Sequence, residues 1–261
     1  MKNYLVIPAA RCGSSAAGPG GPQFHNIYHQ MADMQIESAA ENLKGLDDIK
    51  IIDEHFDTTE DLFEYIFHYV YDLAHTEECN ILQAMSDTLY IKETNIFGVY
   101  EDFSLFGCCP GKLDIPNNPH PLHLDSVRYY PHTMEESVWD WGKKLWEKSD
   151  IMNVNKNTFW GYEMVVYASM FYKQRNGFYL QKKDGVYHNL INHLEDTKHL
   201  ACKTGLEWCN HYGNTNLVGE YQWKPCNTED ATILEYAATR GHQEQLQLMT
   251  ESYNKFIKGV K

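Results

Sequence analysis

The sequence lacks the signatures of several large classes of protein. No stretch of its 261 residues approaches the run of about 20 apolar residues that a membrane-spanning helix needs. The apolar run near the N-terminus is too short for the core of a signal peptide. The seven cysteines are odd in number and include no CxxC pair, so they indicate neither a disulfide framework nor a common zinc motif. We therefore expect a cytoplasmic protein without a membrane span.

Two nucleotide-binding signatures are also missing. The phosphate-cradling pattern GxxxxGK[ST] does not occur. The glycine-rich stretch GPGGP, residues 18–22, carries proline where the helix of a dinucleotide fingerprint should open. The sequence thus disfavours NAD-binding and ATP-binding folds of these two kinds.

Positive charge is scarce, because 22 lysines and arginines stand against 36 acidic residues, for a net charge of −14. A sequence-independent nucleic-acid surface needs clustered basic residues, so nucleic acid is possible as a partner but not favoured. An anionic ligand would have to be held by a metal ion or by backbone N–H groups.

Aromatic residues are plentiful, with 18 tyrosines, 11 phenylalanines and 6 tryptophans. Such rings fill cores, and they also stack on sugars and bases in binding sites. With 43% hydrophobic and 22% charged residues, the chain can bury a sizeable core.

Short apolar runs alternate with helical patterns over the first ninety residues. We expect strands at 4–10, 50–53 and 80–85, and helices at 24–43 and 62–74. This alternation predicts an α/β fold with a single mixed, mainly parallel sheet flanked by helices, of Rossmann-like type.

The pattern changes beyond Asp87. We expect a long loop at 108–121, helices at 134–148 and 162–172, and one or two helices at 233–257. No linker divides the chain. We therefore expect one domain over residues 1–261, with a nucleotide-binding half at 1–100 and an acceptor-binding half at 101–261.

Ligands of open α/β sheets bind beyond the carboxyl ends of the strands. The expected loop at 12–22 begins there, and its small residues would let the backbone approach a nucleotide closely; a mobile surface loop is the alternative. Five further positions are candidates for nucleotide or diphosphate contacts. They are Ala9, Ala10 and Arg11 at the end of the first strand, Asp53 after the second strand, and Arg128 on an expected substrate-facing loop. The alternative is a solvated loop acid for Asp53 and a surface ion pair for Arg128.

The strand end at residues 81–91, ILQAMSDTLYI, places Asp87 where a carboxylate could hold a divalent cation; a turn or cap residue is the alternative. This segment resembles the strand and acidic turn of glycosyltransferases of the GT-A fold. Their motif reads Asp-x-Asp, and in this sequence only Asp87 remains of it. The resemblance implies a Mn²⁺ or Mg²⁺ ion that binds the diphosphate of a nucleotide sugar.

Two later segments resemble motifs of the same superfamily. Residues 157–171, NTFWGYEMVVYASMF, are similar to the Trp-Gly-x-Glu acceptor motif of inverting transferases, although Met164 replaces its usual second acid. The resemblance implies that Trp160, Gly161 and Tyr162 contact substrate and that Glu163 is the general base. Residues 190–199, LINHLEDTKH, resemble the segment in which a histidine completes the metal site, which implies that His193 is a metal ligand.

The expected function is therefore a metal-dependent, inverting transfer of a sugar from a nucleotide-diphospho-sugar donor to a glycan or other hydroxyl acceptor. Three alternatives stay open. They are a phage-type DNA base glycosyltransferase, a nucleotidyltransferase of related fold, and a carbohydrate-binding module without catalytic activity.

Overall fold

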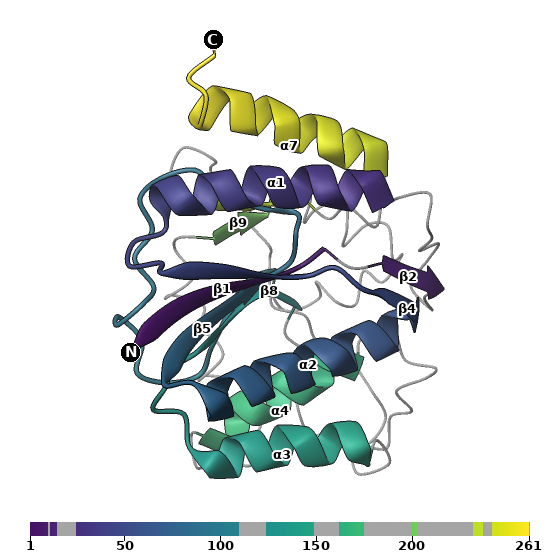
Figure 1. Cartoon of the computed structure of the whole chain (residues 1–261), viewed down its shortest axis with the longest axis vertical. Coiled ribbons are helices and arrows are strands. Elements are labelled where there is room, and N and C mark those ends of the chain that lie inside the picture. Colours follow the sequence, from purple (N-terminus) through teal and green to yellow (C-terminus); the bar gives the residue numbers. More distant parts are fainter. Residues whose placement is uncertain are drawn as a thin grey trace, which may run out of the picture.

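Helices cover both faces of a central β-sheet (Figure 1). The computed structural model describes residues 1–9, 11–14, 25–109, 124–148, 162–174, 200–202, 232–236 and 242–260. Among these residues, no helix combines the length and the apolar character that crossing a membrane requires.

The central sheet has five strands in the order β3-β1-β5-β8-β7. Their bounds are β1 Lys2–Pro8, β3 Asp48–Ile52, β5 Cys79–Ala84, β7 Ser104–Cys109 and β8 Leu124–Tyr130. Strand β1 is parallel to both β3 and β5, whereas β8 is antiparallel to β5 and β7. The predicted α/β class with a mixed sheet flanked by helices is confirmed.

Five helices lie on the two sides of this sheet. Helix α1 (His25–Asn42) covers one face, and α7 (His242–Phe256) packs on the outer side of α1 (Figure 1). Helices α2 (Thr59–Thr76), α3 (Glu136–Glu147) and α4 (Tyr162–Gln174) lie over the other. Side chains alternate along β1 between these layers, with Tyr4 and Val6 in the core under α2, α3 and α4, and Leu5 and Ile7 in the core under α1.

Two smaller sheets extend this framework. Strands β6 (Thr88–Tyr90), β10 (Ile233–Glu235) and β9 (Leu200–Cys202) form a three-stranded sheet that packs beneath α1. Strands β2 (Arg11–Ser14) and β4 (His55–Thr58) pair in parallel and continue β1 and β3 beyond the main sheet.

Four expectations differ from the structure. The loop expected from Cys12 begins as strand β2, and the loop expected from Cys108 begins inside strand β7. Arg128 lies on strand β8 and not on a loop, and the stretch expected to begin a helix at Ile233 begins as β10. Strands β2 and β10 have only four and three residues, and charged residues interrupt the apolar pattern of β8, so local periodicity does not reveal them.

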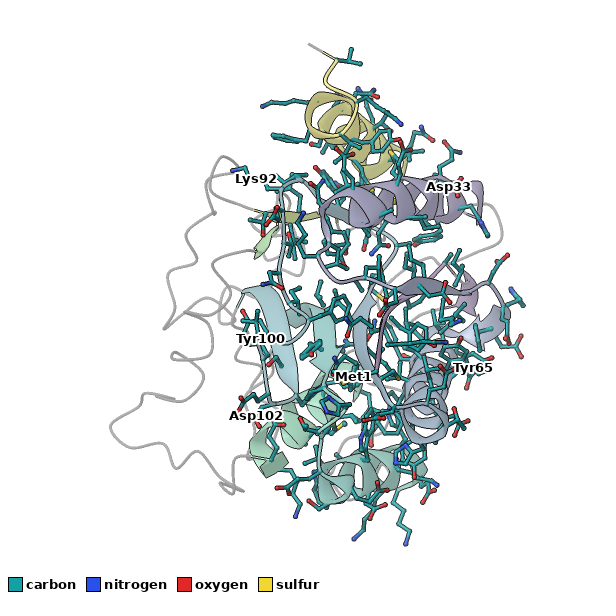
Figure 2. The ribbon with its side chains drawn as sticks, turned by 60° about the vertical axis from the view of Figure 1, so that its left-hand side comes forward. Met1, Asp33, Tyr65, Lys92, Tyr100 and Asp102 are labelled. Carbon is teal, nitrogen blue, oxygen red and sulfur yellow. The ribbon has the colours of Figure 1, made fainter. Side chains whose placement is uncertain are left out.

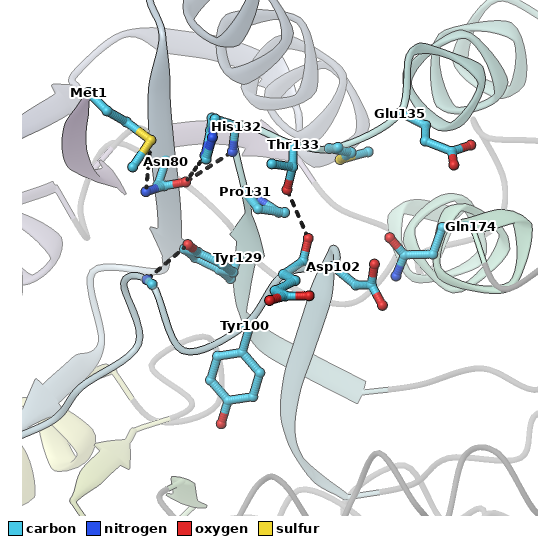
Figure 3. Close-up of a pocket in the computed structure, with 13 residues that line it drawn as sticks. Met1, Asn80, Tyr100, Asp102, Tyr129, Pro131, His132, Thr133, Glu135 and Gln174 are labelled. Carbon is cyan, nitrogen blue, oxygen red and sulfur yellow. Dashed lines mark hydrogen bonds between the residues drawn. The ribbon is translucent and has the colours of Figure 1, made fainter.

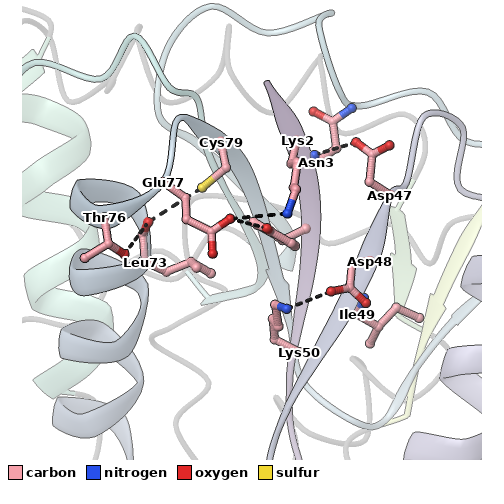
Figure 4. A network of polar contacts seen from close by, with 11 residues as sticks. Lys2, Asn3, Asp47, Asp48, Ile49, Lys50, Leu73, Thr76, Glu77 and Cys79 are labelled. Carbon is pink, nitrogen blue, oxygen red and sulfur yellow. Dashed lines mark hydrogen bonds and ion pairs between the residues drawn. The ribbon is translucent and has the colours of Figure 1, made fainter.

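Polar contacts join neighbouring elements on both sides of the main sheet. At the start of β1, the Tyr4 hydroxyl donates to Glu77, which follows α2. Lys50 on β3 lies beside this pair, with its Nζ 2.7 Å from Asp48 Oδ2 and 4.9 Å from the centre of the Tyr4 ring (Figure 4). The hydrogen bond from Tyr4 lowers the pKa of Glu77. On the opposite face, Tyr253 and Lys258 both contact Glu37 and so attach the end of α7 to α1.

Close packing of α3 against α2 and α4 depends on a glycine. A Cβ atom at Gly142 would lie 2.5 Å from Met170 Sδ and 2.8 Å from the ring of Phe67, which is fully buried. We expect Gly142→Ala to lower the free energy of unfolding by about 1–3 kcal/mol, because overpacking outweighs a gain in helix propensity of about 1 kcal/mol. Denaturant unfolding measures this difference.

The matched control is Asp140→Ala, an exposed position on the same helix, which should change stability by less than about 0.5 kcal/mol. A Gly142→Ala variant as stable as the parent protein would show that α3 does not pack as closely as described.

Candidate functional site

The carboxyl ends of β1, β3 and β5 meet at one edge of the main sheet. From β1 the chain crosses through α1 to β3 on one side, then through α2 to β5 on the other. Because α1 and α2 cover opposite faces, the chain reverses direction at β1 and leaves a topological switch point between β1 and β5 (Figure 1). Ligands of open α/β sheets bind in the crevice at such a point.

Ala9 lies at this edge, at the end of β1. It is fully buried, and its N–H donates to the carbonyl of Ile52 at 3.0 Å. Arg11 lies on β2, where its backbone is in register with His55, and its side chain is outside the described residues. Ala10 and residues 15–24 are outside them as well, so the expected nucleotide contact there stays a prediction.

Asp53 follows β3 at the same edge and pairs with a histidine that the sequence did not single out. Asp53 Oδ1 lies 3.0 Å from Nε2 of His29, which is near the start of α1. Both side chains are partly exposed, so the pair contributes about 1 kcal/mol at most to stability. This contact joins the start of α1 to the carboxyl end of β3.

Asp87 follows β5 and lies close to the end of β1. Val6 on β1 and Gln83 on β5 are the last pair of residues in register between the two strands. Ala9 comes three residues after Val6, and Asp87 comes four residues after Gln83. The carbonyl of Asp87 accepts from the N–H of Tyr236 at 2.8 Å, which sets the turn into β6. Thr88 comes next, and its buried Oγ1 has no hydrogen-bond partner within the described structure.

Arg128 is a buried cation on β8, beside the carboxyl end of β5. It is 3% exposed and donates from Nη1 to Gln83 Oε1 at 3.0 Å. Its guanidinium carbon lies 3.8 Å from the centre of the Tyr167 ring and 5.9 Å from that of Phe63. Burying a guanidinium is costly, and the amide and the two ring faces offset part of that cost.

Glu163 and Tyr162 begin α4 at this end of the sheet. Glu163 is 6% exposed and lies one helical turn before Tyr167, so it is on the side of α4 that carries the ring under Arg128. Tyr162 is fully buried, and its hydroxyl donates to the carbonyl of Leu145 at 2.5 Å. In this structure Tyr162 anchors α4 to α3.

A further carboxyl group lies where α2 begins. Glu60 is 9% exposed, and burial raises its pKa above the usual range. Its Oε1 has no hydrogen-bond partner within the described part of the chain. Thr58 is the N-cap of the same helix, and its side chain accepts from the N–H of Asp61.

The structure thus brings some predicted residues together. Arg128 contacts Tyr167, and Glu163 lies one helical turn before Tyr167 on α4. Asp87 leads into β6 on the α1 face, so the two acidic groups approach the edge from opposite faces. Trp160, Gly161 and His193 are outside the described residues. No group of three or more metal-binding side chains occurs among the residues that are described.

Two of the missed residues left signals in the sequence. Gln83 is a fully buried amide on strand β5, and a buried polar residue there requires a partner. Tyr167 lies four residues after Glu163, which places it on the same side of a helix. No protein-family model matches the chain, and no curated protein matches it in sequence, so the functional argument depends on this geometry and on the sequence motifs.

Proposed function

We propose that this protein is a metal-dependent glycosyltransferase that binds a nucleotide-diphospho-sugar donor in the crevice between the ends of β1 and β5. The observation that carries the proposal is the position of Asp87. It is a carboxylate directly after a central strand, beside the end of β1, at a topological switch point.

The nucleotide end of the donor would lie toward β1 and β3. Asp53 is exposed at the end of β3, where its carboxylate can accept hydrogen bonds from ribose hydroxyls. The protein has few positive charges to attract the diphosphate. The buried guanidinium of Arg128 is a positive group near this edge, and its field is weakly screened because it is desolvated.

Asp87 suits a hard divalent cation, because Mn²⁺ and Mg²⁺ prefer carboxylate oxygen ligands. His193 would supply the second protein ligand. When bound, the ion would neutralise the negative charge of the leaving diphosphate.

Glu163 would act as the general base on the acceptor side. In an inverting transfer the acceptor oxygen bonds to the anomeric carbon, the bond from that carbon to the diphosphate breaks, and the hydroxyl proton passes to the base. The position of Glu163 in the first turn of α4 favours its ionised form, because the helix dipole stabilises negative charge there.

Donor binding gives the first test. In a thermal-shift panel of nucleotide-diphospho-sugars, we expect one class to stabilise the protein only when Mn²⁺ is present. At a hundredfold excess over its Kd, such a ligand contributes about 2.7 kcal/mol. We expect Asp87→Ala to abolish this metal-dependent gain, because it removes the carboxylate ligand.

The matched control is Glu41→Gln, an exposed position on α1, which should leave donor binding unchanged. Stabilisation by nucleotide sugars that needs no metal and survives Asp87→Ala would contradict the metal site. Stabilisation by free sugars alone would favour a carbohydrate-binding module.

Turnover of the donor tests Glu163. Glu163→Gln keeps the shape of the side chain and removes the base, so we expect donor binding to persist while turnover falls by a factor of about 10²–10⁴. Steady-state product formation measures the loss. Normal turnover by this variant, or a product that retains the anomeric configuration of the donor, would reject Glu163 as the base of an inverting reaction.

A further inference from the structure

A cavity of about 470 Å³ lies at the opposite, amino-terminal edge of the main sheet (Figure 3). The starts of β1 and β5, the end of β8 and the segment before β7 meet there, because β8 runs against its neighbours. Its volume falls within the range of small-molecule sites. None of the residues assigned to the proposed transferase site lines it.

A chain of hydrogen-bonded amide groups holds the ring of His132 in place at the wall of this cavity. Asn3 Nδ2 donates to the carbonyl of Gly45 at 2.7 Å, so Asn3 Oδ1 accepts from Asn80 Nδ2 at 2.8 Å. Asn80 Oδ1 then accepts from the backbone N–H of His132 at 2.9 Å and lies 3.2 Å from its ring Nδ1 (Figure 3). Since a carbonyl oxygen can only accept, Nδ1 carries a proton and the neutral ring offers Nε2 as an acceptor.

Two polar side chains on the other walls are hydrogen-bonded within the protein. The Gln174 side chain accepts from the N–H of Phe103 at 2.9 Å and donates to the carbonyl of the same residue at 2.5 Å. Thr133 Oγ1 donates to the carbonyl of Glu101 at 3.0 Å (Figure 3). These bonds hold the walls in place.

The charge of the lining is negative. Glu101, Asp102 and Glu135 contribute carboxylates, and no lysine or arginine is present among the described residues that line the cavity. Glu135 receives a hydrogen bond from Ser137 at 3.3 Å, whereas the carboxylates of Glu101 and Asp102 have no donor within the described structure. The aromatic ring of Tyr100 adds a further surface that attracts cations.

We propose that this cavity binds an organic cation that carries a guanidinium or primary ammonium group. Such a group offers several N–H donors and a positive charge to a wall of acceptors and carboxylates, and it can stack on an aromatic ring. The cation can come from a small polyamine-like molecule or from a basic side chain of a peptide. This inference is independent of the proposed transferase activity, because the two sites lie at opposite edges of the sheet.

Isothermal titration calorimetry tests the cavity with agmatine and spermidine as small probes and with a capped tripeptide that has a central arginine. We expect a probe that binds to do so with a stoichiometry of one molecule per chain. The double variant Glu101→Gln/Asp102→Asn should weaken binding about tenfold or more, because it removes charge-assisted hydrogen bonds. His132→Ala should also weaken binding, because it removes the Nε2 acceptor. Preference for the small probes or for the peptide identifies the source of the cation.

The matched control is Asp33→Asn, which removes an exposed carboxylate on α1, away from Tyr100 and Asp102 (Figure 2). Thermal unfolding verifies that each variant is folded. The proposal is overturned if no probe binds, or if Asp33→Asn weakens binding as much as the cavity variants, which would show diffuse attraction to an acidic protein. Binding of Mn²⁺ that the double variant abolishes and agmatine cannot displace would also overturn it, in favour of a metal site.

Discussion

Strand β1 is buried on both faces and hydrogen-bonded on both sides, and the arrangement of the rest of the structure depends on this constraint. A strand of this kind needs a helical layer over each face and a partner strand at each edge. The chain meets both needs by sending α1 over one face and α2 over the other. The crevice between the ends of β1 and β5 is therefore a consequence of covering β1, and Ala9, Asp53 and Asp87 lie where the surrounding strands end.

The buried cation is a second constraint, and it connects the core with the proposed chemistry. Arg128 is held between Gln83 on the sheet and Tyr167 on α4. Tyr167 lies one helical turn after Glu163 on the same helix. A neutral residue of similar size would pack there without the cost of desolvating a charge. The retention of a guanidinium at this position is consistent with an electrostatic role at the nearby edge, where a diphosphate donor would otherwise meet a strongly acidic protein.

Much of the frame could be predicted from the sequence, because β1, β3 and β5 are apolar runs and the helices have local periodicity. Strands β2 and β10 could not, because they have only four and three residues, and β7 and β8 could not, because small or charged residues interrupt their apolar pattern. Asp53 and Asp87 could be predicted as candidate site residues, because each follows an expected strand. Arg128 was expected on a loop and lies in the sheet. His29 was missed, because its place in the site depends on a contact with the distant residue Asp53 that no local pattern encodes.

Hydrogen–deuterium exchange of the intact protein, with and without a saturating nucleotide-diphospho-sugar and Mn²⁺, tests most directly where the donor binds. The account predicts slower exchange in peptides that contain the carboxyl ends of β1, β3 and β5, around Ala9, Asp53 and Asp87, because a ligand in the crevice covers these backbone groups. Peptides that contain His132, at the opposite edge, should be unchanged. Protection confined to that opposite edge, or no protection anywhere, would contradict the account.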